Sequence, residues 1–224
     1  MDFAETEDQQ MIREMVREFA ETVAGPTCEK RDKEQIAPIE EFKKFAELGF
    51  AGMTIPEQYG GQKLDDISEA IVIEELSRVD PSLGVMVAVH VGLCSMTIAL
   101  SGNEAQKEKY LPKLASGEFL GAYSLSEAGS GTDAAAMVAK ATDDGDCYTL
   151  NGEKMWVTNG TTADLFVLFA KVTDHPDYGK KSHGGVTCFI IEKGFEGFEI
   201  AKKQDKLGIR SSETCTLIIN KCKV

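Results

Sequence analysis

The first half of the chain has its apolar residues at helical spacing. Near the start they recur every three or four positions, at Met11, Ile12, Met15, Val16, Phe19 and Val23. Thr6 and Gln9 form a capping-box pattern ahead of this face, and Gly25-Pro26 is a stop signal, so one helix is expected between them. Similar spacing and punctuation predict further helices over 38–49, 66–77, 81–100 and 105–114.

After residue 118 the pattern changes to short runs of valine, threonine and aromatic residues, which is typical of strands. Asn151-Gly152 is the strongest short hairpin signal and predicts a turn between two strands. The predicted strands cover 119–125, 137–142, 147–150, 154–158, 165–172, 186–192, 198–201 and 214–219. We therefore expect an α+β protein, with an all-helical domain over 1–118 and a small antiparallel β-barrel or sandwich domain over 119–224.

Composition narrows the class of protein. With 42% hydrophobic and 27% charged residues, the 224-residue chain can bury a core. A net charge of −13 argues against nucleic acid and anionic membrane surfaces as partners, because both need a basic face. The six Cys form no Cys-x-x-Cys pair and there are only three His, so we expect reduced thiols and no metal site.

The ends and apolar runs of the sequence point to a cytoplasmic protein. The N-terminus is acidic, whereas a signal or transit peptide is basic there. The most apolar run, 83–100, is interrupted by His90, Gly92 and Ser95, so no membrane span is expected.

One stretch has the composition of a ligand-binding loop. Residues 119–125 read as a strand, and Gly129-Ser130-Gly131 then breaks it. Small residues let a backbone approach a ligand closely, and consecutive free N–H groups can hold an anion such as a diphosphate. Ser126 and Thr132 add hydroxyls. An ordinary Gly/Ser turn between two strands explains these residues equally well.

A second stretch, 151–160, contains the only Trp in the chain, and together the two resemble the acyl-CoA dehydrogenase family of flavoenzymes. Leu125-Ser126-Glu127 followed by Gly131-Thr132-Asp133 matches the first family motif, although Ala128 stands where the family usually has Pro. Residues 151–160 match the second motif, Asn-Gly-x-Lys-x-Trp/Phe-Ile/Val-Thr-Asn-Gly, almost throughout. The resemblance extends over essentially the whole chain.

The resemblance implies that FAD lies against the β domain. The Ser126 hydroxyl and backbone N–H groups would meet the pyrimidine edge of the flavin, Trp156 would pack on its ring system, and Thr158 would bond near N5. Taken alone, Trp156 and Thr158 are more typical of ordinary strand residues. The full set of implied cofactor residues is Tyr123, Ser124, Leu125, Ser126, Gly131, Thr132, Trp156, Val157 and Thr158.

The resemblance also implies an acyl-CoA site. Thr132 would face the substrate, and Ser182, beside Lys180-Lys181 in the polar stretch 173–185, would help to hold the CoA moiety, although a solvated loop explains these residues as well. Met86 and His90 would form the floor of the acyl pocket, where bulky side chains favour a short to medium acyl chain. A lone His on an apolar helix is more often a core residue.

The reaction implied by the resemblance is the α,β-dehydrogenation of an acyl-CoA to a 2-enoyl-CoA. The family's catalytic base is a glutamate on a C-terminal helical domain beyond the two domains seen here, so we expect the chain alone to be inactive and to bind FAD poorly. The implied partners are an electron-transfer flavoprotein and a dimeric or tetrameric homo-oligomer, or a separate C-terminal-half subunit. The alternatives are a non-catalytic FAD- or acyl-CoA-binding or interaction module, and part of an acyl-CoA oxidase.

Overall fold

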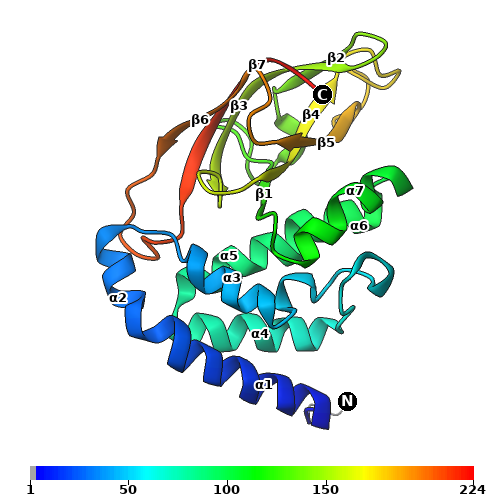
Figure 1. Ribbon diagram of the computed structural model, residues 1–224. Coiled ribbons are helices and arrows are strands. Elements are labelled where there is room, and N and C mark those ends of the chain that lie inside the picture. Colours follow the sequence, from blue (N-terminus) through cyan, green and yellow to red (C-terminus); the bar gives the residue numbers. More distant parts are fainter. Residues whose placement is uncertain (1–3) are drawn as a thin grey trace. The chain divides into compact units, whose positions relative to one another are not determined.

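The computed structural model describes residues 4–224 and divides into two compact units (Figure 1). The helical unit runs to Phe119 and includes the segment Asp205–Ser212. The sheet unit comprises Leu120–Gln204 and Glu213–Val224. The regular structure of the first is helical and that of the second is mainly strand, so the expected α+β class is confirmed.

The helices of the described chain are α1 (Glu7–Phe19), η1 (Ala20–Ala24), α2 (Gly25–Glu34), α3 (Ile39–Glu47), η2 (Phe50–Gly52), η3 (Glu57–Tyr59), α4 (Asp66–Val79), α5 (Pro81–Ala88), η4 (Val89–Ser95), α6 (Met96–Ser101), α7 (Glu104–Ala115) and, in the sheet unit, η5 (Ala134–Ala136). The capping box at Thr6 is confirmed, because its side chain accepts from the Gln9 backbone while the Gln9 side chain accepts from the Thr6 backbone.

The predicted helix stop at Gly25-Pro26 is wrong. Helix α1 passes through the π-helical turn η1 directly into α2, and Gly25 N–H donates to the Ala20 carbonyl five residues earlier. Proline lacks an N–H and crowds the preceding turn, but it is tolerated at the start of a helix. The wide π turn lets Pro26 take that position in α2 without ending the helical path.

A second π turn, η4, joins α5 to α6, so that Pro81–Ser101 is one long helical run. Its length and apolar composition are enough to cross a membrane, but half of its most apolar window is buried within the protein, as in a soluble core helix. Asp80 begins the run by accepting hydrogen bonds from Ser82 N–H and Leu83 N–H, both at 3.1 Å.

A buried ionic cluster holds α1 against α4. Glu75 on α4 accepts from Arg13 at 2.6 Å and from Arg17 at 2.8 Å, both on α1, and from Arg78 at 3.3 Å. Its side chain is only 2% exposed. The hydrogen bond from Arg17 is the main cause that lowers the Glu75 pKa to about 2, with Arg13 and Arg78 adding to it and burial opposing it.

This pKa predicts a loss of stability in acid. The pKa of Glu75 in the folded protein lies below its ordinary value of 4.5. Its contribution to the free energy of unfolding is therefore present above pH 4.5 and is lost as the pH falls toward about 2. Glu75→Gln should therefore unfold more easily than the parent at neutral pH, and the difference should shrink over that window. Urea unfolding across the window measures it, with the exposed Glu14→Gln on α1 as control. A difference independent of pH would contradict the assignment.

The sheet unit contains β1 (Gly121–Ser124), β2 (Lys140–Asp143), β3 (Tyr148–Thr158), β4 (Leu165–Val172), β5 (Val186–Glu192), β6 (Phe198–Lys203) and β7 (Thr214–Lys223). They form one sheet in the order β1-β4-β2-β3-β7-β6, and β5 pairs with β4 (Figure 1).

The expected antiparallel barrel or sandwich needs correction. β1 and β2 both pair in parallel with β4, whereas the remaining pairs are antiparallel, and the sheet is not closed. These parallel pairs join strands that are distant in sequence. No hairpin turn connects them, so local turn residues do not predict the pairing. Phe166, Phe189, Leu217 and Ile219 lie in the core on this sheet.

The predicted hairpin at Asn151-Gly152 is also wrong, because both residues lie inside the single strand β3. The turn that joins β2 to β3 is at Asp144–Cys147, where Asp144 N–H donates to the Cys147 carbonyl. Gly152 is needed for another reason. A Cβ there would lie 2.6 Å from the Ala139 Cβ, so its lack of a side chain permits a close approach where the pairing of β3 with β7 shifts register.

Candidate functional site

The loop after β1 is closed by its own backbone. Glu127 N–H donates to the Ser130 carbonyl at 2.8 Å, and Ser130 N–H returns a bond to the Glu127 carbonyl at 3.1 Å. The Ser130 hydroxyl donates to the Asp133 carbonyl at 2.9 Å. Gly129 and Gly131 are exposed, and no described atom lies within 4 Å of where a Cβ would stand on either. The tip of the loop therefore offers open space beside its backbone.

A β-bulge in β3 turns Trp156 outward. The pairing of β3 with β7 shifts register between Lys154 and Val157, and Trp156 has a φ of 58°. One extra residue reverses which face each following side chain takes, so Val157 is buried while the Trp156 side chain is 62% exposed. A positive φ is unusual for a bulky residue, and such strain is found at functional sites.

The loop and the bulge are hydrogen-bonded to each other. Met155 N–H donates to the Ser126 carbonyl at 2.9 Å. Lys154 Nζ donates to the Leu125 carbonyl at 3.0 Å and to Glu127 Oε1 at 2.7 Å. The two motifs recognised in the sequence are thus adjacent in the sheet unit.

Glu127 and Lys154 form a buried ion pair beneath the loop. The two side chains are 4% and 0% exposed. Glu127 also accepts from Val138 N–H at 2.6 Å and Ala139 N–H at 3.1 Å, so both carboxylate oxygens are engaged. Burial lowers the pKa of Lys154, and the nearby Glu127 opposes that shift.

Other predicted site residues lie around this loop. Ser124 is buried in β1, and its hydroxyl has no hydrogen-bond partner among the described residues. Tyr123 packs against Phe169 at 5.2 Å between ring centroids, and burial raises its pKa. Thr158 ends β3 and is half-buried, beside Asn159, whose Nδ2 donates to the Gly121 carbonyl at 3.0 Å.

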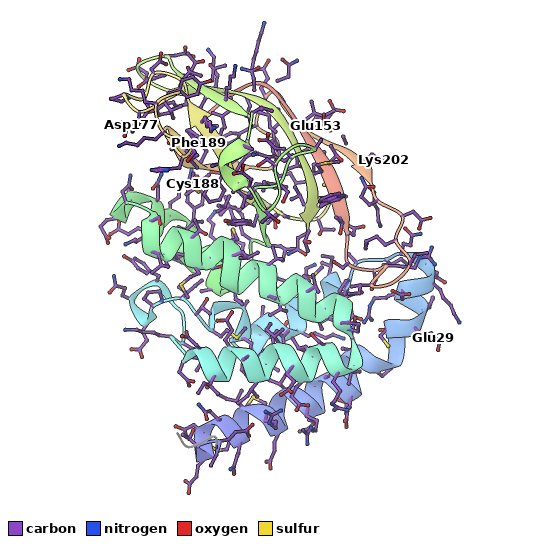
Figure 2. All side chains as sticks on the ribbon, turned by 180° about the vertical axis from the view of Figure 1, so that it is seen from behind. Glu29, Glu153, Asp177, Cys188, Phe189 and Lys202 are labelled. Carbon is purple, nitrogen blue, oxygen red and sulfur yellow. The ribbon has the colours of Figure 1, made fainter. Side chains whose placement is uncertain are left out.

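A basic pocket of about 530 Å³ lies in the same unit. Lys171 Nζ donates to the Ala135 carbonyl at 2.7 Å, and Lys181 pairs with Asp177 at 2.8 Å. Asp177 lies on the loop between β4 and β5 (Figure 2). The charged, polar and exposed apolar residues that line the pocket are Lys140, Lys171, Lys180, Lys181, Tyr178, Ser182 and Val138. Ser182 is thus placed among lysines, as an anion site requires.

Met86 and His90 lie in the helical unit, and both are fully buried. His90 Nε2 is 3.1 Å from the Leu114 carbonyl, and its ring meets Phe42 edge-on at 5.1 Å between centroids. Burial lowers the His90 pKa to about 4, so its ring is neutral at pH 7. These contacts are those of a core residue, and the predicted contact of Met86 and His90 with an acyl chain stays a prediction.

Two family models match the chain. Residues 6–118 match the family model "Acyl-CoA dehydrogenase, N-terminal domain", and residues 122–222 match "Acyl-CoA dehydrogenase, middle domain". This chain belongs to the acyl-CoA dehydrogenase family. The resemblance drawn from the two motifs is therefore confirmed.

Among its relatives, the short-chain specific acyl-CoA dehydrogenase of Clostridium acetobutylicum is 44% identical over 97% of this chain and 56% of its own length. A solved structure described as the electron transferring flavoprotein of Acidaminococcus fermentans contains a chain that is 45% identical with a TM-score of 0.93, covering 100% of this chain and 58% of that one. An acyl-CoA dehydrogenase complexed with FAD from Bacillus anthracis is 36% identical with a TM-score of 0.88, covering 98% of this chain and 36% of that one. The chain spans about half the length of the curated relatives it matches.

The residues around the loop and the Trp156 bulge fit a flavin. The buried Ser124 hydroxyl lacks a partner among the described residues, the glycines leave open space beside the loop, and the exposed Trp156 ring offers an apolar face. Sequence reasoning missed the Glu127–Lys154 pair. A signal was present, because strand alternation puts Lys154 on the same face as the buried Leu150, where an unpaired lysine is costly.

Proposed function

We propose that this chain forms the FAD- and acyl-CoA-binding part of an acyl-CoA dehydrogenase that converts an acyl-CoA to a 2-enoyl-CoA. The observation that carries the proposal is the hydrogen-bonded junction of the loop with the Trp156 bulge. It places the two family motifs side by side, through Met155 N–H to the Ser126 carbonyl. An exposed aromatic ring next to an open glycine loop suits a planar cofactor that carries a diphosphate.

Bound FAD would supply the hydride acceptor. Loop N–H groups and the hydroxyls of Ser124, Ser126 and Thr132 would hold the cofactor, and Trp156, Val157 and Thr158 would orient its ring. Removal of the substrate α-proton needs a free carboxylate. Glu127 is unsuited to that role, because both its oxygens are bound by Lys154, Val138 and Ala139 beneath the loop.

The basic pocket would take the phosphates of CoA. Four lysines and the Ser182 hydroxyl converge there, and ammonium groups bind phosphates by charge-assisted hydrogen bonds. The net charge of −13 does not oppose this, because the local charge of the pocket is positive.

Lys180→Ala tests this placement. Lys180 is exposed and lines the pocket, so its removal should not disturb folding. We expect CoA affinity to fall by about fivefold at low salt, and the loss should shrink as salt is added. Titration calorimetry with CoA measures both effects. Lys202→Ala, in β6 and not among the pocket-lining residues, is the matched control, and an equal loss there would contradict a local phosphate site.

The decisive experiment adds acyl-CoA anaerobically to the flavin-loaded natural polypeptide that carries this sequence. Bleaching of the oxidised flavin absorption supports a dehydrogenase. Binding without bleaching favours the alternative, a binding or interaction module. Rapid reoxidation by air favours an acyl-CoA oxidase, whereas reoxidation by an electron-transfer flavoprotein and not by air supports that protein as the partner.

Substrate length and assembly extend this proposal. The buried Met86 and His90 motivate a short to medium acyl chain, and the short-chain specificity of the Clostridium relative supports it. Titration with a series of saturated acyl-CoAs of increasing length tests this preference. Long chains that bind as tightly as short ones would contradict it. A homo-oligomer, dimer or tetramer, or a complex with a separate C-terminal-half subunit is also proposed, and light scattering of the natural polypeptide tests it.

A further inference from the structure

We propose that Glu127 and Lys154 are positioning residues, whose buried ion pair sets the loop, the Trp156 bulge and the rim of the basic pocket in one fixed arrangement. This inference rests on the proposed function, because the ligands that it serves are the flavin and the CoA moiety. Neither side chain is exposed enough to touch them, so both act through the backbone groups that they hold.

The pair ties together the two ends of the loop. Lys154 Nζ binds the Leu125 carbonyl, where the chain leaves β1. Glu127 accepts from Val138 N–H and Ala139 N–H, where the chain approaches β2. Since Lys154 and Glu127 are themselves 2.7 Å apart, one ion pair closes the base of the loop.

Residues bonded or adjacent to this ion pair belong to both proposed ligand sites, the flavin site and the basic pocket. Lys154 immediately precedes the bulge, and the next residue, Met155, donates to the Ser126 carbonyl in the loop. Val138, which donates to Glu127, also lines the basic pocket and is 74% exposed. A change in the pair would therefore shift the flavin contact and the pocket rim together.

Energetics favour a positioning role over simple stabilisation. Removing two charges from water is costly, and apolar residues of similar size often stabilise a core as well or better. What an apolar pair cannot supply is directed hydrogen bonding to backbone groups. Here the ion pair makes three such bonds, to the Leu125 carbonyl and from Val138 and Ala139 N–H.

Lys154→Met tests the inference in the natural polypeptide. In the flavin-free protein, amide hydrogen exchange over 126–139 should become faster. FAD and CoA should each bind about 10- to 100-fold more weakly, which is the usual loss when a residue that orients the direct contacts of a bound group is removed. The absorption bands of bound flavin should also change shape. The matched control is Lys33→Met, which removes the exposed partner of Glu29 and should change none of these.

The double variant Glu127→Gln with Lys154→Met separates position from stability. With no unpaired buried charge, it should melt near the parent temperature, yet retain fast loop exchange and weak flavin binding. It also carries the test if Lys154→Met does not fold. If the double variant binds flavin and CoA as tightly as the parent, the positioning role is overturned and the proposed function is not. If the parent protein itself binds no flavin, the proposed function is overturned and the positioning role with it.

Discussion

Arg31→Met is expected to destabilise the helical unit by about 3–5 kcal/mol. Arg31 on α2 has a side chain that is 7% exposed, and it pairs with Asp80 through Nη2 and with Glu41 at 2.5 Å through Nη1. Nη2 also donates to the Ala24 carbonyl at 3.1 Å. Methionine fills similar space but leaves the buried Asp80 carboxylate and the partly buried Glu41 carboxylate without their cation.

The loss of stability in Arg31→Met should be large because Asp80 also caps a helix. It caps α5 by accepting from Ser82 and Leu83 N–H, so its displacement would also loosen the start of the long helical run. Urea unfolding followed by far-ultraviolet circular dichroism measures the change.

The control for Arg31→Met is Lys33→Met on the same helix. Lys33 pairs with Glu29 at 2.6 Å, but the two side chains are 72% and 81% exposed, and Glu29 extends outward from α2 (Figure 2). Solvent screens such a pair, so no resolvable change in the unfolding midpoint is expected. Equal effects of the two substitutions would show that burial of the Arg31 cluster does not matter.

Gly131→Val is expected to weaken FAD binding about 100-fold while leaving the fold intact. A Cβ on Gly131 meets no described atom within 4 Å, and the residue has no left-handed φ, so the chain itself accepts a side chain there. The same open space is where the flavin diphosphate is proposed to approach the backbone. Valine would therefore collide with the ligand and not with the protein.

Flavin fluorescence quenching measures the affinity, and thermal unfolding without flavin verifies the fold. Gly208→Val is the matched control, since Gly208 also has open space around its Cβ position and a φ outside the left-handed region, but lies in the segment Asp205–Ser212 of the helical unit. Unchanged affinity in Gly131→Val would mean that FAD does not approach this loop.

Much of the local structure follows from local signals. The predicted strands 165–172 and 186–192 coincide with β4 and β5, and helices α3, α4 and α7 end within two residues of their predicted bounds. These elements have strong periodicity and clear punctuation at both ends, which depend on neighbouring residues only. The spacing of the two motifs likewise identified the family before the fold was known.

Local signals misled where distant residues decide the conformation. Asn151-Gly152 has the composition of a hairpin turn, yet pairing with β7 keeps it inside β3, where Asn151 Oδ1 accepts from Lys221 N–H at 2.9 Å. Gly25-Pro26 has the composition of a helix end, yet the π turn η1 carries the helix through it. Gly152 is instead needed for the close approach to Ala139. Pro26 instead lies at the start of α2, where a residue without an N–H is tolerated.

By itself, the sequence determined the fold class, most helices and strands, and the two motifs that mark an acyl-CoA dehydrogenase. Only the tertiary structure decided the parallel pairing of β1 and β2 with β4, the outward turn of Trp156, and the burial of Lys154 against Glu127. The physical reason is the range of the interactions. Caps and periodicity act over one or two turns, whereas strand partners, bulges and buried ion pairs depend on groups that lie far apart in the chain and meet only after folding.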